Sequence, residues 1–232
     1  MQIIEHIALL GPLDWAAVGS ILVAWFVISW MIEHPGAKRP SVTVLMSERR
    51  RDWMKAFVTR EPRIFDSQIL SSLRQGTSFF ASTSLLAAGA VLALAGNTEP
   101  LRGVAAEVSD MAVPVVIFQL KLAFVAIFLT NAFLKFVWAN RVFGYCAVMM
   151  AAVPNDPADP ISYPRAAQAA ELNIRAAINF NRGLRAMYFA LAALAWLLGP
   201  IALMIATVVV VWIVWSREFA SLPRSILLKE EV

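Results

Sequence analysis

A lysine stands inside an apolar stretch of this sequence, where it could line a path for an anion. The stretch, residues 119–141, reads QLKLAFVAIFLTNAFLKFVWANR. At 100° per residue, Lys121, Asn131 and Lys135 fall on one stripe of a helix. Charged side chains within membrane spans usually face a bundle interior or a hydrated cavity, and they mark ion pathways. We therefore treat these three residues as a candidate pore or buried polar stripe.

A structural role for Lys121 is the alternative. If the helix begins near Val113, Lys121 lies about 12 Å along it at 1.5 Å per residue. At that depth its side chain could extend to the membrane interface and keep its ammonium in water. Asp14, at the outer end of the first apolar run, is a candidate partner. Both interpretations stay open.

A second candidate site consists of polar residues that follow the third apolar run and precede the fourth. Their amides and guanidiniums could form a vestibule at the cytoplasmic mouth of a pore. They are Asn140, Arg141, Asn181, Arg182 and Arg185. Helix capping, phosphate contact and the charge bias of cytoplasmic loops explain the same residues with fewer assumptions.

The segment SERRRDWMKAFVTREP, residues 47–62, combines basic residues with an apolar helical face. Ser47 is a suitable N-cap for a short helix in which Trp53, Met54, Phe57 and Val58 share one face. Such a helix could lie on anionic lipid. The basic residues that would bind the headgroups are Arg49, Arg50, Arg51 and Lys55. Packing of the apolar face against the protein's own helices is the alternative.

Motifs for catalysis or cofactor binding do not occur in the sequence. The two histidines, His6 and His34, flank the first apolar run and so cannot hold one haem between them. No Cys, His and carboxylate residues have the spacing of a zinc site. A phosphate-binding loop, a nucleophile elbow and an H-E-x-x-H helix are also missing. We predict no cofactor, no metal and no enzymatic activity.

The composition indicates which elements carry these residues. Of 232 residues, 59% are hydrophobic and 16% are charged, and the mean hydropathy is +0.67. Four apolar runs approach or exceed the roughly 20 residues that cross a hydrocarbon core. They comprise residues 15–32, 75–98, 111–134 and 186–216. We therefore predict an all-α membrane protein with a single domain, 1–232, and four transmembrane helices, some projecting into the cytoplasm.

Basic residues indicate the orientation of these crossings. Segments 33–74 and 135–185 are rich in Lys and Arg, whereas residues 97–110 contain only Arg102. Because cytoplasmic loops carry such an excess, we expect both segments inside the cell. Four crossings then place both termini outside the cytoplasm. The net charge of +4 fits this topology better than nucleic-acid binding.

Residues 142–155 are uncharged but too short for a span of their own. Proline residues at positions 154, 157 and 160 break any helix at its end. The segment could therefore continue the third helix, lie at the interface or re-enter the membrane.

Several ordered motifs resemble one known family. They are REPRIFDSQI at residues 60–69, SFFAST at 78–83, WANRVFGYC at 138–146, FNRGLRAMYFALAALAW at 180–196 and REFAS at 217–221. Together they are similar to the integral-membrane family catalogued as domain of unknown function 599, over about residues 14–221. The resemblance implies a small multi-pass membrane protein and supplies no reaction, ligand or catalytic residue.

The sequence favours a role in transport. We expect an oligomeric channel or transporter for a small solute, in particular an anion, in the inner (plasma) membrane of a bacterium. Four helices from one chain rarely enclose a wide pore, so assembly would supply the missing wall. The alternative is a non-catalytic accessory or scaffold subunit of a larger membrane complex. The expected partners are membrane lipids, anionic on the cytoplasmic side, and copies of this chain or another complex; no nucleic acid is expected.

Overall fold

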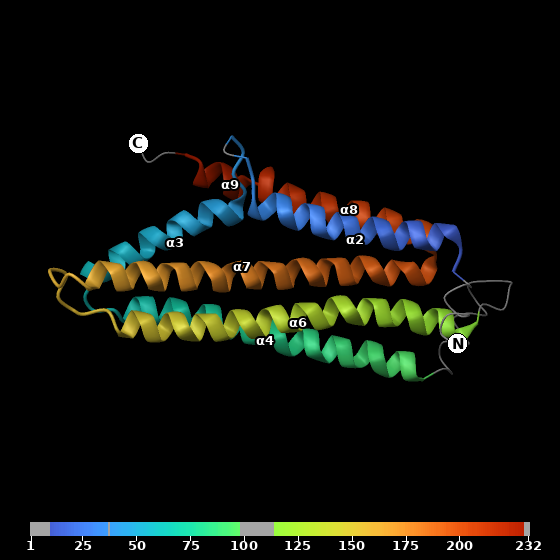
Figure 1. Cartoon of the computed structure of the whole chain (residues 1–232), viewed down its shortest axis with the longest axis horizontal. Coiled ribbons are helices and arrows are strands. Elements are labelled where there is room, and N and C mark those ends of the chain that lie inside the picture. The colour runs from blue at the N-terminus through green and yellow to red at the C-terminus, as the bar shows by residue number, and fades with distance from the viewer. Residues whose placement is uncertain (1–9, 37, 98–113, 230–232) are drawn as a thin grey trace. The chain divides into compact units, whose positions relative to one another are not determined.

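The structure, a computed structural model, describes residues 10–36, 38–97 and 114–229. These residues form helices and no strand (Figure 1). Four helices are long and apolar enough to span a membrane. They are α2 (Pro12–Glu33), α4 (Ile64–Gly96), α6 (Val115–Ala151) and α8 (Pro200–Phe219). The prediction of an all-helical protein with four such helices is confirmed.

Other helices connect these four in the described chain. They are α3 (Val42–Thr59), α7 (Ser162–Leu194), the 3-10 helix η1 (Ala195–Leu198) and α9 (Leu222–Leu227). The hydroxyl of Ser41 accepts a hydrogen bond from the Val44 amide and so caps α3. Ser47, the predicted cap, lies inside α3 instead, where its hydroxyl donates to the Thr43 carbonyl. The helix is therefore longer than the sequence suggested.

The apolar run at 186–216 is divided between two helices. α7 ends at Leu194 and continues into η1, which ends at Leu198, and α8 begins at Pro200. Gly199 lies between them at φ 126°, a conformation that favours glycine because it has no Cβ. Proline at the first helical position then starts α8, since the amide it lacks has no partner there.

The third apolar run continues into one long helix. α6 extends to Ala151, so residues 142–151 are part of the third helix rather than a separate interfacial or re-entrant segment. α4 likewise begins at Ile64, before the apolar run at 75–98. His6 and Arg102 lie outside the described residues, as does the beginning of the third run.

The chain divides into two compact units. Unit 1 comprises residues 1–30, 83–132 and 184–215, and unit 2 comprises residues 31–82, 133–183 and 216–232. α2, α4, α6, α7 and α8 contribute residues to both.

The core of unit 1 is aromatic and aliphatic. Phe128 of α6 is fully buried, and its ring contacts Trp25 of α2 and Phe189 of α7, with centroids 5.2 and 6.3 Å apart. Large side chains on α2 and α8, such as Phe26 and Trp212, are about two-thirds exposed. Exposed apolar side chains on long apolar helices suit a lipid environment.

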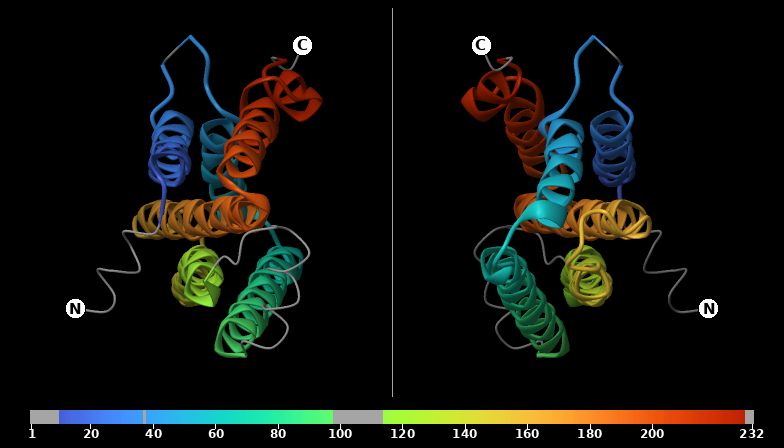
Figure 2. Two further views of the ribbon diagram at one scale, coloured as in Figure 1. Left: turned by 90° about the vertical axis from the view of Figure 1, so that its right-hand side faces the viewer. Right: turned by 90° about the vertical axis from the view of Figure 1, so that its left-hand side faces the viewer.

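The core of unit 2 joins four helices. Met54, Phe57 and Val58 of α3 pack in one cluster with Leu70 of α4 and with buried residues of α6 and α7. The apolar face of α3 therefore packs against the protein itself, which is the alternative given above. Figures 1 and 2 show the first part of α7 between α3 on one side and α4 with α6 on the other.

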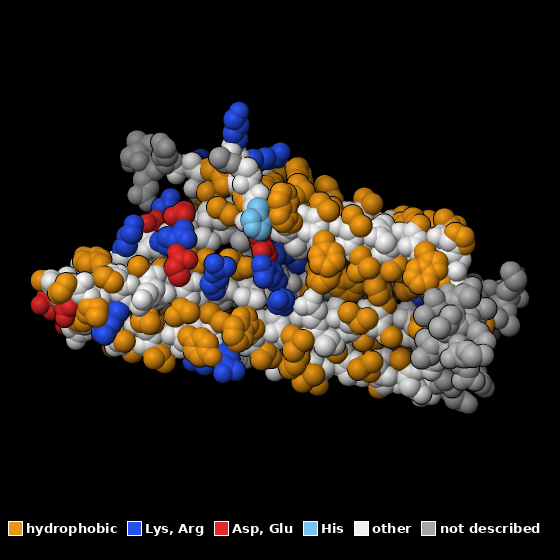
Figure 3. Space-filling view, in the orientation of Figure 1, with side chains coloured by type: hydrophobic (Ala, Val, Ile, Leu, Met, Phe, Trp, Pro, Cys, Tyr) orange, Lys and Arg blue, Asp and Glu red, His pale blue; other side chains and the backbone are white. Residues whose placement is uncertain are grey.

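Charge separates sharply between the units. Unit 2 holds every Lys and Arg of the chain except Arg102, Lys121 and Arg185. On the face in Figure 3, basic and acidic side chains gather over α3 and the adjoining part of α7. The positively charged side chains of the chain are therefore concentrated in unit 2.

Candidate functional site

Lys121 of the predicted pore stripe is enclosed within unit 1. Its residue is 8% exposed. The ammonium nitrogen lies 5.7 Å from the centroid of the Phe118 ring and 5.6 Å from that of the Trp196 ring. Contacts of this kind stabilise a desolvated cation by up to about 2 kcal/mol.

Asp14 completes this surrounding. Its Oδ1 accepts a hydrogen bond of 2.7 Å from the indole nitrogen of Trp196, and its Oδ2 accepts one of 3.2 Å from the Gly11 amide. The carboxylate also acts electrostatically on Lys121. These contacts link α2, α6 and η1, and they favour the structural interpretation of Lys121.

The other two residues of the stripe are less enclosed. Asn131 lies in unit 1 and Lys135 in unit 2, and both are half-buried. They lie one turn apart on α6, about 6 Å along its axis. Lys121 precedes Asn131 by almost three turns.

Four of the five predicted vestibule residues bond to different partners. Arg182 forms an ion pair with Glu33. Asn181, beside it on α7, donates from its amide nitrogen to the Thr43 hydroxyl at 3.4 Å. These contacts tie α7 to the end of α2 and to α3.

The remaining vestibule residues are also engaged in separate places. Arg141 is exposed and donates to the Tyr145 hydroxyl one turn further along α6 at 2.5 Å. Arg185 is buried in unit 1 and donates to the Ser29 hydroxyl at 3.2 Å. Asn140 lines a pocket described below.

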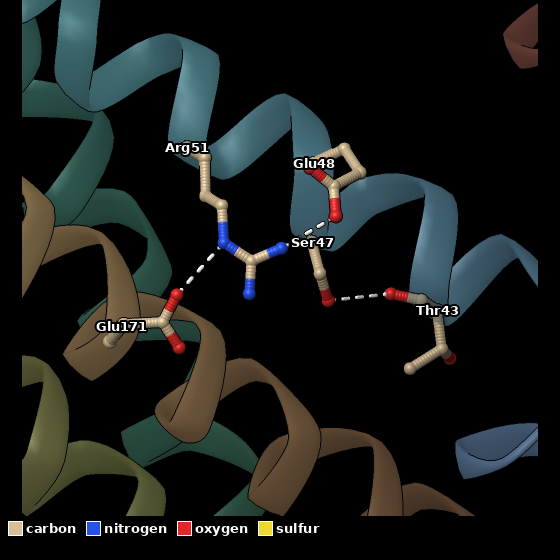
Figure 4. A network of polar contacts seen from close by, with 5 residues as sticks. All are labelled: Thr43, Ser47, Glu48, Arg51 and Glu171. Atoms are coloured by element: carbon tan, nitrogen blue, oxygen red, sulfur yellow. Dashed lines mark hydrogen bonds and ion pairs between the residues drawn. The ribbon is translucent and has the colours of Figure 1, made fainter.

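Two of the four predicted headgroup residues instead hold α3 to α7. The Arg51 Nε donates to Glu171 at 2.8 Å, and its Nη1 donates to Glu48 at 2.6 Å (Figure 4). The hydrogen bond to Glu171 raises the pKa of Arg51. Arg50 donates to the buried amide oxygen of Asn173, and burial lowers the pKa of Arg50.

The other two headgroup candidates face solvent. Arg49 forms an exposed pair with Asp52 at 3.3 Å, and Lys55 is exposed. Exposed pairs of this kind contribute only about 0.2–1 kcal/mol. Among the described residues, Arg49 and Lys55 therefore form no bond to another helix.

A pocket of unit 2 lies between α4 and α6 and has a volume of about 700 Å³. The α4 wall is polar except for Leu70. It presents Ser67, Ser71, Arg74, Gln75 and Ser78. The α6 wall is small and largely apolar, and none of the described residues that line the pocket is acidic.

Arg74 is the unpaired cation of this pocket. It is exposed and has no hydrogen-bond or ion-pair partner among the described residues. Its side chain extends toward α6, because Nη2 lies 3.9 Å from the position that a Cβ on Gly144 would occupy. A Cβ at that distance would make only ordinary van der Waals contact, so a larger side chain at position 144 is needed to crowd the guanidinium.

A second arginine, Arg63, lines the far end of the pocket but is already occupied. It donates to the carbonyls of Val153 at 2.8 Å and Pro154 at 2.7 Å, just beyond the C-terminus of α6, and its guanidinium lies over the Phe57 ring. Carbonyl partners do not neutralise its charge. Arg63 thus stabilises the end of α6 and adds positive potential to the pocket.

Asn140 contributes an unsatisfied polar atom. Its Oδ1 is buried and has no hydrogen-bond partner among the described residues. A rotation of 180° exchanges the oxygen and nitrogen of an amide, so Asn140 can accept from or donate to a ligand. Buried polar groups are normally paired, which marks this position as a place for a ligand or an ordered water.

This pocket was not among the sites predicted from the sequence. Its α4 wall follows a helical pattern, with polar residues at 67, 71, 74, 75 and 78 just before the apolar run. The sequence shows this pattern, but Arg74 is also the last residue of the basic segment 33–74, which we used only to predict the orientation. The vestibule prediction did include Asn140.

The comparisons identify the family. The model of the family described as "Protein of unknown function, DUF599" matches residues 16–223. The chain belongs to this family. No curated protein and no solved structure matches it significantly. In the described part of the DUF599 chain, no three His, Cys, Asp or Glu side chains gather to hold a metal ion.

Proposed function

We propose that this DUF599 protein is a non-catalytic, oligomeric channel or transporter for a small anionic solute, in which the α4–α6 pocket takes up the anion. The observation that carries the proposal is Arg74, a cation without a partner in a pocket without an acidic side chain. Oriented donors and positive charge raise the local concentration of anions. Lys121, by contrast, is packed against two rings.

The proposed orientation places unit 2 on the cytoplasmic side of a bacterial inner membrane. The segregation of Lys and Arg into this unit supports it, because cytoplasmic loops carry the excess of basic residues. The anion would then enter the pocket from the cytoplasm. Exposed Arg49 and Lys55 would contact anionic lipid at the same surface.

We also place the C-terminus in the cytoplasm, which revises the expectation that both termini lie outside. Glu218, in the last turn of α8, accepts hydrogen bonds from the amide and hydroxyl of Thr43 at 3.0 and 2.9 Å. Arg224 Nε donates to the Pro40 carbonyl at 2.9 Å. A segment bonded in this way lies on the same side of the membrane as the basic segment 33–74.

An outside N-terminus and an inside C-terminus require an odd number of crossings. The end of α7 together with η1, residues 184–198, would add a fifth. At 1.5–2.0 Å per residue this stretch is roughly 25 Å long, close to the hydrocarbon thickness of about 30 Å. α8 would then return to the cytoplasm.

Cysteine labelling tests this orientation. In a Cys146→Ala background, a cysteine at the exposed position Ser225 should react with a membrane-impermeant maleimide only after the cytoplasmic side is opened. A cysteine at the exposed Leu13 should react in intact cells. Reaction of the position 225 cysteine in intact cells would contradict the five-crossing arrangement.

Anion flux tests the function. Purified protein in liposomes should conduct a panel of small anions, and Arg74→Gln should lower that flux about tenfold, because one charge-assisted contact is worth about 1.5–3 kcal/mol. Arg175→Gln is the matched control, since Arg175 is an exposed arginine of unit 2 outside this pocket. Absence of flux for every anion would refute the transport proposal.

A second function, an accessory or scaffold subunit of a membrane complex, is favoured by a different observation. The Lys121 site is filled by aromatic rings, and α2 and α8 expose large apolar side chains. These faces suit lipid or a partner's helices equally. Co-purification of one stoichiometric foreign subunit after gentle extraction, together with an absence of flux, would favour this function.

A further inference from the structure

We infer that the α4–α6 pocket binds an organic phosphate, with the phosphate group on Arg74 and the organic part against the α6 wall. This inference deepens the proposed function and rests on it only in using the same pocket. It goes further by assigning the chemical class of the ligand. The shared chemistry covers two sources, the headgroup of an anionic phospholipid and a soluble phosphate ester.

The α4 wall of the pocket offers more hydrogen-bond donors than the two oxygens of a carboxylate can accept from. The guanidinium of Arg74 presents a planar fork of N–H donors, and arginine binds phosphate in a bidentate manner. Ser71 and Ser78 lie one turn on either side of Arg74, and Gln75 follows it directly. A phosphate group has more oxygens to satisfy than a carboxylate, and this wall offers more donors than two oxygens can use.

The electrostatics exclude a cationic ligand. The described lining contains Arg63 and Arg74 and no Asp or Glu. Arg63 precedes Arg74 by three turns, about 16 Å along α4, so it adds potential rather than a contact to the same phosphate. The pocket therefore carries excess positive charge along its whole length.

The opposite wall explains why the ligand is organic. Ala147, Met150 and Ala151 of α6 form a small, apolar surface that faces the polar wall of α4. An inorganic phosphate occupies only a small part of a pocket of about 700 Å³. Burial of apolar groups against this wall adds about 25 cal/mol per Å², which an inorganic anion cannot gain.

The pocket lies at a depth that both sources can reach. The stacked rings of Phe80 and Phe136 place these two residues at one level of α4 and α6. The apolar runs end near this level, at Gln75 on α4 and Leu134 on α6. The pocket begins there and extends away from the run, into the layer where lipid headgroups lie.

Binding to purified full-length protein in a non-ionic detergent tests the inference. Titration calorimetry would compare dihexanoyl phosphatidic acid, glycerol 3-phosphate, inorganic phosphate and hexanoate, with the lipid below its critical micelle concentration. We expect at least one of the two organic phosphates to bind at one site per chain, at least tenfold more tightly than inorganic phosphate and hexanoate. Tighter binding of the lipid identifies a headgroup, and equal or tighter binding of glycerol 3-phosphate identifies a soluble ester.

Two variants locate the site. Arg74→Gln should weaken binding about tenfold or more, and Gly144→Leu should weaken it by filling the space beside the guanidinium. Arg175→Gln and Gly76→Leu are the controls, since nothing lies within 4 Å of a Cβ at Gly76. All four should keep the wild-type unfolding midpoint within a few degrees.

Other outcomes overturn the inference. If inorganic phosphate binds as tightly as the esters, the ligand need not be organic. If hexanoate binds as tightly, the pocket does not prefer phosphate. If Arg74→Gln binds like the wild type, the phosphate does not bind at Arg74. Binding without anion flux would refute the transport function and keep this inference. Anion flux without binding of either ester would refute this inference and keep the transport function.

Discussion

Lys121 and Arg74 differ in how they look in the sequence and in how accessible their charges are in the structure. Lys121 stands out in the sequence because it interrupts an apolar run, yet in unit 1 it is 8% exposed and packed against Phe118 and Trp196. Arg74 looks ordinary because it ends a basic loop. In unit 2 it is exposed, unpaired among the described residues and open to a pocket.

The free-energy cost of burying a charged side chain and the accessibility of that side chain to a ligand are therefore separate properties. A buried charge is tolerated only when neighbours compensate it, and those neighbours also block access to it. An interfacial charge costs little and can stay unpaired. A ligand site for an anion is therefore expected where the charge is free, on the unit 2 side.

The largest effect should follow from breaking the surroundings of Lys121. Asp14→Ala removes the acceptor of the buried Trp196 indole and the carboxylate that acts on Lys121. We expect the free energy of unfolding to fall by about 2–3 kcal/mol. The midpoint of thermal unfolding in detergent measures it.

The control for this prediction comes from unit 2. Asp52→Ala removes an equally charged side chain from an exposed pair with Arg49, so its effect should stay below about 0.5 kcal/mol. If Asp14→Ala were as mild as Asp52→Ala, the enclosed network would not be structural. The contrast between the two units would then be lost.

A smaller effect should follow from crowding unit 2 away from its pocket. A Cβ on Gly183 of α7 would lie 2.7 Å from Cε1 of Phe136, whose ring also contacts Phe80 and Phe180. Because that ring is held on several sides, Gly183→Ala should destabilise the protein by about 1–3 kcal/mol. Thermal unfolding in detergent again provides the measurement.

Gly89→Ala in unit 1 is the matched substitution, since nothing lies within 4 Å of a Cβ there. Alanine replaces glycine in a helix with a gain of up to about 1 kcal/mol, so this variant should be neutral or slightly more stable. Equal behaviour of both variants would show that unit 2 is loosely packed throughout. Its pocket would then lose its meaning as a defined site.

Hydropathy predicted much of the fold from the sequence. The apolar runs correspond to α2, α4 and α6, and the apolar face of α3 is buried as one of its two interpretations expected. The division at Gly199 and Pro200 was missed, although a Gly-Pro pair is a turn signal, because an unbroken apolar run was given more weight.

The candidate site was less predictable because its meaning depends on partners distant in the sequence. The sequence marks Arg51 as a candidate for lipid, and only the fold shows its ion pair with Glu171 of α7. Likewise, only the fold shows that Glu218 and Arg224 bond to the segment around α3, which is why we propose a cytoplasmic C-terminus. Local spacing cannot reveal which of many arginines finds an acid, and the unpaired Arg74 emerges only after those pairs are known.

The most direct test of the central claim is a crossed measurement on two variants, Arg74→Gln and Lys121→Met, with anion flux and the unfolding midpoint recorded for each. We expect Arg74→Gln to lower flux about tenfold and to leave the midpoint unchanged. We expect Lys121→Met to lower the midpoint by about 2–4 °C, equivalent to about 1 kcal/mol, and to leave flux unchanged. Normal flux through Arg74→Gln, with a specific loss of flux in Lys121→Met, would show that Lys121 and not Arg74 serves the anion.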